Sequence, residues 1–151
     1  MSPIVLDTSV VIAASLSPLG AAGSLLEAFY RERLTFAYTK AILDEYLEVM
    51  ERPKFAAIVD SNARVSFALK LRASGSLMVP ASVPKAKWPD KDDLPFVAAA
   101  LATEQKIIVT LNPRDFAPAT RFGIRVLSPS EARRELLPPP INGLPPRSTW
   151  A

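Results

Sequence analysis

Short apolar segments alternate with longer amphipathic segments along most of this chain. The apolar segments have the length and residue types of buried β-strands, and the segments between them have the spacing and capping residues of α-helices. Because strands that alternate with helices usually pair in parallel, the sequence predicts an α/β three-layer sandwich with a central, mostly parallel sheet. The five expected strands are Ile4–Leu6, Leu34–Tyr38, Leu77–Val79, Ile107–Thr110 and Ile124–Leu127.

Six helices are expected between and after these strands. Thr39 and Ser128 are residue types that favour helix N-caps, and Thr8 or Ser9 would cap the first helix. The six expected helices are Val10–Ala14, Ser24–Arg31, Lys40–Glu51, Ser61–Ser74, Asp93–Glu104 and Pro129–Leu137.

The length of 151 residues favours one compact domain, which we expect to comprise residues 1–137. Residues 138–151 contain five of the 15 prolines, so they are expected to form a Pro-rich C-terminal tail without regular helix or central strand. An extended tail is the simpler interpretation. The alternative is a peptide that docks on a partner, with Leu144 and Trp150 as anchors.

The longest apolar stretch, residues 10–22, is broken by Ser15, Ser17, Pro18 and Gly20, so no transmembrane helix is expected. The N-terminus begins with a strand-like segment and lacks the basic and apolar regions of a secretory signal. The expected location is therefore the cytoplasm.

The chain has no Cys and no His. These absences exclude thiol nucleophiles, the Ser-His-Asp triad and most zinc enzymes. The five glycines form no phosphate-binding loop. Any chemistry would therefore depend on carboxylates.

The net charge of +3 is compatible with a nucleic-acid partner but does not establish one. Setting aside four candidate acids leaves 11 acidic against 18 basic residues. A basic body around an acidic pocket would attract phosphates while the pocket held a cation. A mixed, solvated surface is the alternative interpretation.

Two of the candidate acids are Asp7 and Glu45. Asp7 follows the first expected strand, at the sheet edge where ligands bind in open parallel sheets, although a helix cap would explain it equally well. Glu45 lies three residues after Ile42 and four before Val49, so it borders the apolar stripe of its helix. It would need either a basic partner or a pocket.

The other two candidates are Asp93 and Asp115. Asp93 begins an Ala-rich helix on its inward face, and we expect it, rather than Asp90 or Asp92, to belong to the site. Asp115 follows the strand that ends near Thr110, where an Asn-Pro turn is the structural alternative.

If these four carboxylates converge, they would repel one another unless a divalent cation neutralised them. Oxygen ligands without His or Cys favour Mg²⁺ or Mn²⁺ over Zn²⁺.

Several segments resemble PIN-domain proteins, in their order and spacing over residues 3–137. The resemblance is closest to the VapC-like toxin ribonucleases of prokaryotic toxin–antitoxin pairs. The segments that carry it are VLDTSV (5–10), LDE (43–45), RPKF (52–55), DKDDLPF (90–96), VTLN (109–112) and FGIRVLSP (122–129).

This resemblance implies a Mg²⁺- or Mn²⁺-dependent endoribonuclease, a homodimer and a cognate antitoxin protein. By that match, Asp7 and Asp93 would be direct metal ligands, while Glu45 and Asp115 would complete the catalytic pocket. Asn112 stands where many members of the family have Asp. It brings no charge, so a second metal ion would be held more weakly.

Further residues are expected to support this chemistry. Ser9, Thr110 and Asn112 would orient the carboxylates, although the first two also suit a cap and a turn. The residues expected to contact RNA are Lys85, Lys87, Trp88 and Arg114. For Trp88, packing on the core is the alternative.

Other functions fit the sequence less well. A haloacid-type phosphatase needs a second Asp where Ser9 stands, and a response-regulator receiver needs a Lys after a later strand. Two alternatives remain: a catalytically weak PIN-like module that binds RNA or a protein partner, and a nuclease specific for DNA structures.

Overall fold

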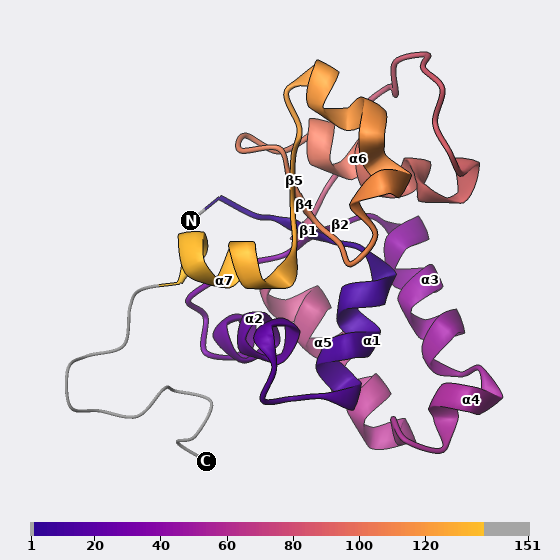
Figure 1. Cartoon of the computed structure of the whole chain (residues 1–151). Helices are drawn as coiled ribbons and strands as arrows, with labels where there is room; N and C mark the ends of the chain where they lie inside the picture. The colour runs from indigo at the N-terminus through magenta and orange to yellow at the C-terminus, as the bar shows by residue number, and fades with distance from the viewer. Residues whose placement is uncertain (1, 138–151) are drawn as a thin grey trace.

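The computed structural model describes residues 2–137 (Figure 1). Leu144 and Trp150, the possible anchors of the Pro-rich tail, lie outside the described residues.

Two sets of parallel strands form the sheet. Strands β1 (Val5–Leu6), β4 (Ile107–Val109) and β5 (Arg125–Leu127) pair in the order β1-β4-β5. Strands β2 (Ala37–Tyr38) and β3 (Ser76–Leu77) form a second parallel pair. A parallel bridge between Ile4 and Phe36 joins the two sets, so the five strands follow the order β3-β2-β1-β4-β5.

Every residue of β1 and β4 is buried. Strands covered on both faces by helices are uniformly apolar, which is why these segments show no alternation of polar and apolar residues. In Figure 1, α6 (Leu94–Leu101) lies on one side of the strands, and α1 (Thr8–Leu16), α2 (Ala21–Tyr30) and α7 (Pro129–Leu136) lie on the other. The predicted α/β sandwich with a central parallel sheet is confirmed.

The helices α3 (Lys40–Met50) and α5 (Ser61–Ser74) complete the larger helical elements. Thr39 caps α3 by accepting a hydrogen bond from the Ile42 N–H at 3.3 Å, as predicted. The ranges predicted for α3, α5 and α7 agree with the structure to within one residue at each end.

Several expectations about the ends of elements are wrong: α2 begins at Ala21 and not at Ser24, and α6 ends at Leu101 and not at Glu104. Helix α1 begins at Thr8 and not near Val10, with Asp7 in the N-cap position. Helix α6 begins at Leu94, because the preceding residues form a separate 3₁₀ turn, η1 (Lys91–Asp93).

Two short helical elements were not expected. One is α4 (Pro53–Ala56). The other is the 3₁₀ element η2 (Pro113–Phe122), which is kinked at Phe116 and ends at Gly123 with a φ of 81°. A short kinked 3₁₀ segment has no sustained apolar period, so the sequence signals only a turn there.

No single helix in residues 2–137 is long and apolar enough to cross a membrane. Helices α1 and α2 reach the required length and apolarity only as a pair, which is bent by 94°.

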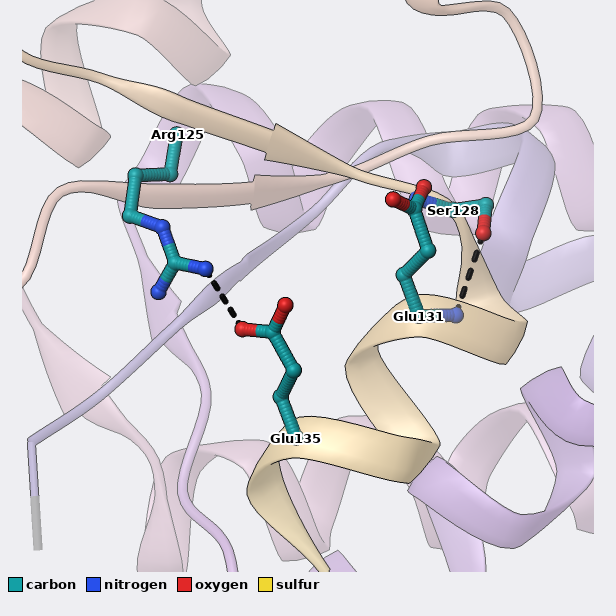
Figure 2. Close-up of polar contacts among 4 residues, drawn as sticks. All are labelled: Arg125, Ser128, Glu131 and Glu135. Atoms are coloured by element: carbon teal, nitrogen blue, oxygen red, sulfur yellow. Dashed lines mark hydrogen bonds and ion pairs between the residues drawn. The ribbon is translucent and has the colours of Figure 1, made fainter.

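Polar contacts cap the last helix and pair it with the last strand (Figure 2). Ser128 and Glu131 form a capping box: the Glu131 N–H donates to Ser128 Oγ at 3.1 Å, and the Ser128 N–H donates to Glu131 Oε1 at 2.9 Å. The hydrogen bond from the Ser128 N–H lowers the pKa of Glu131. One turn further on, Arg125 of β5 pairs with Glu135 at 2.5 Å.

We expect Ser128→Ala to lower the free energy of unfolding by about 1 kcal/mol, because it leaves a helix N–H without its side-chain acceptor. Urea unfolding followed by circular dichroism measures this change. Ser130→Ala is the matched control, since Ser130 is exposed in the same helix and caps nothing. Equal stabilities of the two variants would contradict the capping role.

Candidate active site

The strand order distinguishes one edge of the sheet, where ligands are expected. From β1 the chain moves to β2 and β3 on one side, and it then returns to β4 and β5 on the other side of β1. In such sheets the connections from neighbouring strands diverge at the reversal point, and ligands bind at the carboxyl ends of those strands. Here those strands are β1 and β4, which are followed directly by Asp7 and Thr110.

Asp7 is buried and held firmly at this point. Its N–H donates to the Val109 carbonyl at 2.9 Å, as part of the pairing between β1 and β4. Its Oδ2 accepts hydrogen bonds from Thr110 Oγ1 at 2.7 Å and from Ser9 Oγ at 2.9 Å. Within the described residues Oδ1 accepts no side-chain hydrogen bond, so one oxygen is anchored and the other is free for a ligand.

Glu45 reaches the same edge from α3. The hydroxyl of Thr8 donates a short hydrogen bond to Glu45 Oε2. Burial raises the pKa of Glu45, and the charge of Asp7 raises it further, while the Thr8 hydrogen bond opposes these effects. The half-buried carboxyl group therefore lies within electrostatic range of Asp7 and keeps Oε1 free of side-chain donors in residues 2–137.

The surroundings of Asp93 strongly raise the pKa of its carboxyl group. It is half-buried between η1 and α6 and makes no side-chain capping hydrogen bond. Burial, followed by the charges of Asp7, Asp90, Asp115 and Glu45, raises the pKa of Asp93 to about 7. Carboxylates from separate segments of the chain thus act on one side chain.

Asp115 lies half-buried in η2, just after β4. Neighbouring Asn112 is exposed and contributes its backbone: the Asn112 N–H donates to Thr110 Oγ1 at 3.0 Å. Thr110 is fully buried, and its hydroxyl donates a hydrogen bond to Asp7. The turn that contains Asn112 therefore orients Asp7 through Thr110.

In residues 2–137 no cationic side chain forms an ion pair with these carboxylates. The ion pairs in that part of the chain join Arg31, Arg52, Lys70 and Arg125 to other acids. Within the same residues, no three acidic side chains are arranged closely enough to hold an ion as they stand. The side-chain donors at this edge are all oxygen atoms, the ligand type that Mg²⁺ and Mn²⁺ prefer.

The residues expected to contact RNA are spread around this edge. Lys85 and Lys87 are exposed on the loop between β3 and η1, and Arg114 is exposed beside Asp115. Trp88 is half-buried: its ring lies 6.0 Å from that of Phe122, and its Nε1–H donates to the Pro84 carbonyl at 2.9 Å.

Two positioning residues escaped the sequence analysis. One is Thr8, which holds Glu45. The other is Tyr46, whose buried hydroxyl donates to the Leu6 carbonyl at 2.5 Å and so fixes the end of β1 next to Asp7. Thr8 follows Asp7 and Tyr46 follows Glu45 in the sequence, and this adjacency was the only signal that could have indicated their roles.

A family model described as PIN domain matches residues 3–114 of the chain. No curated protein and no solved structure matches it.

The raised pKa of Asp93 predicts how stability depends on pH in the metal-free protein. The carboxyl group binds its proton more tightly when folded, with a pKa of about 7 against an ordinary value of 3.8. Its favourable contribution to stability is therefore complete below pH about 3.8 and disappears as the pH rises through about 7.

We expect Asp93→Asn to gain stability over the wild type between pH 5 and pH 8, measured by urea unfolding with a chelator present. Asp44→Asn, an exposed change on α3, should show no such trend. A difference between Asp93→Asn and the wild type that stays constant with pH would show that Asp93 is not perturbed in this way.

Proposed function

Because the chain belongs to the PIN-domain family, whose members are generally metal-dependent nucleases, we propose that it is a Mg²⁺- or Mn²⁺-dependent endoribonuclease. The observation that supports this proposal is that the charges of Asp7, Glu45 and Asp115 all act on Asp93, while no cationic side chain in residues 2–137 pairs with these acids.

In this proposal Asp7 and Asp93 hold the cation, and Asp115 adds negative charge beside them. When bound, a divalent cation lowers the pKa of water and stabilises charge on the attacked phosphate. Ser9 and Thr110 keep Oδ2 of Asp7 in place, which would leave Oδ1 available to hold a cation.

Glu45 would orient the attacking water and accept its proton at the free Oε1. Its raised pKa suits this role because it makes the carboxylate a stronger base. Water oxygen bonds to phosphorus, the bond to the 3′ oxygen breaks, and that oxygen takes up a proton. The products are a 5′-phosphate and a 3′-hydroxyl. The chain contains no His to activate a ribose 2′-hydroxyl instead.

RNA would approach over the exposed cations Lys85, Lys87 and Arg114, with Trp88 as a ring at the base of the same loop. Since its N–H is already bonded internally, Trp88 would contribute through its exposed ring edge alone.

Two observations favour a second candidate, a catalytically weak PIN-like module that binds RNA or a protein partner. Asn112 supplies no fourth charge after β4, and no three acids in residues 2–137 are pre-arranged around an ion.

Cleavage of a labelled single-stranded RNA in Mg²⁺ or Mn²⁺ separates the two candidates. We expect Asp7→Asn and Asp93→Asn each to reduce the rate by more than about 100-fold, because each removes a charge that holds the cation. Thr110→Val only loosens Asp7, so its expected loss is about 10- to 100-fold.

Asp44→Asn is the control for a lost carboxylate on the protein surface, and circular dichroism checks that each variant folds. Cleavage that persists in the presence of a chelator would contradict the metal-dependent mechanism. RNA binding without cleavage, unchanged in Asp7→Asn and Asp93→Asn, would establish the binding module. A preference for flaps or duplex DNA would indicate a DNA-structure nuclease.

We further propose that the chain is the toxin of a toxin–antitoxin pair and acts in the cytoplasm as a homodimer. The VapC-like motif order supports these assignments. Expression should arrest growth, Asp7→Asn should not, and co-expression of a small neighbouring gene product should restore growth. Sedimentation checks the dimer, and normal growth with active protein would refute the toxin role.

A further inference from the structure

An apolar groove lies at the same edge of the sheet as the carboxylates. Its volume is about 550 Å³, within the size range of small-ligand sites. Its walls come from the start of α3, the residues at and after the end of β3, and the start of α6. The lining residues are Thr39, Lys40, Ala41, Leu77, Met78, Val79, Pro80 and Pro95.

Two helices link the groove to the candidate active site. Ala41 lies one turn before Glu45 on the same face of α3, and Pro95 lies two residues after Asp93. A ligand in the groove would therefore lie beside a polymer whose phosphate occupied the candidate active site.

The chemistry of the groove is mainly apolar with one cation. The side chains of Leu77 and Val79 are 67% and 85% exposed, which is unusual for large aliphatic residues near a strand. Lys40 is exposed in the lining, and no acidic group in the described part of the chain pairs with it. The apolar side chains of the groove could contact the flat face of a nucleobase. The ammonium group of Lys40 at the margin could contact the phosphate attached to that nucleotide.

We propose that this groove receives an unpaired base of the RNA, next to the phosphate that is cleaved. Lys40 contacts a flanking phosphate, and Leu77 and Val79 cover the face of the base. The inference rests on the proposed nuclease function, and it requires the base to be unpaired, because a base stacked within a duplex cannot enter the groove.

The test compares Leu77→Asn with Leu19→Asn. Leu19 is 72% exposed in the loop between α1 and α2, so both changes remove a similarly exposed aliphatic side chain. One readout is the kinetics of cleavage of a short labelled single-stranded RNA. The other is the fluorescence anisotropy of the same RNA on binding, measured in Ca²⁺ and in chelator. Annealing the RNA to its complement provides the duplex arm.

We expect Leu77→Asn to raise Kd and KM about tenfold and to leave kcat nearly unchanged, because the base contact is made before and during the reaction alike. Leu19→Asn should match the wild type. Lys40→Gln should reduce the slope of log Kd against log salt by about 0.7, whereas Lys54→Gln, in α4 beyond the end of α3, should leave it unchanged.

Equal RNA affinity for Leu77→Asn and Leu19→Asn would overturn the base site. Duplex RNA bound as tightly as single-stranded RNA would also overturn it. If Leu77→Asn changed only the sedimentation of the protein, a second copy would be the occupant and the proposal would be wrong. If the wild type binds single-stranded RNA through Leu77 but cleaves nothing, the groove stands and the nuclease proposal fails.

Discussion

The parallel pairing of β1 with β4 is the contact on which both the sheet and the carboxylate site depend. It aligns Leu6 with Val109, and it thereby brings together segments about a hundred residues apart. The hydrogen bond from Thr110 to Asp7 extends this pairing by one side-chain contact beyond the last paired residues. Tyr46 holds the same strand end from α3, so three segments of the chain fix the position of one carboxylate.

This arrangement also explains why charge accumulates where the fold gains little from it. The edge between diverging connections exposes strand ends, and acidic residues placed there cannot all reach basic partners. Burial raises the pKa of Asp93 and of Glu45, and repulsion between the carboxylates raises both further. Proteins often tolerate such local destabilisation where a ligand restores the balance. The groove beside Leu77 is a second feature of the same edge, apolar where the candidate active site is charged.

Much of the fold could be predicted from the sequence because its signals are local. Buried strands are short apolar runs, and Thr39 and Ser128 mark helix starts by their own side chains. The placement of Asp7 after a strand and of Glu45 beside an apolar stripe followed from the same signals. The prediction of Mg²⁺ or Mn²⁺ came from the oxygen-only set of ligands and from the family resemblance, and the prediction of an RNA substrate depended mainly on that resemblance.

What could not be predicted depends on contacts between distant segments. Thr8 and Glu45 are 37 residues apart, and Tyr46 is 40 residues from Leu6, so no local pattern reveals either hydrogen bond. The structure also shows Asn112 acting through its backbone, whereas the sequence directs attention to its side chain. The packing of Trp88 on Phe122 likewise needs the tertiary structure.

The distance in sequence between β1 and β4 has a consequence for the order of events during synthesis. Translation releases the N-terminal strand and its helices first. The site at the ends of β1 and β4 stays incomplete until Ile107–Val109 has left the ribosome tunnel and has paired with β1. A nascent polypeptide therefore lacks the complete site through most of its elongation. Under the proposed ribonuclease function, this delay would spare the messenger from which the chain is being translated.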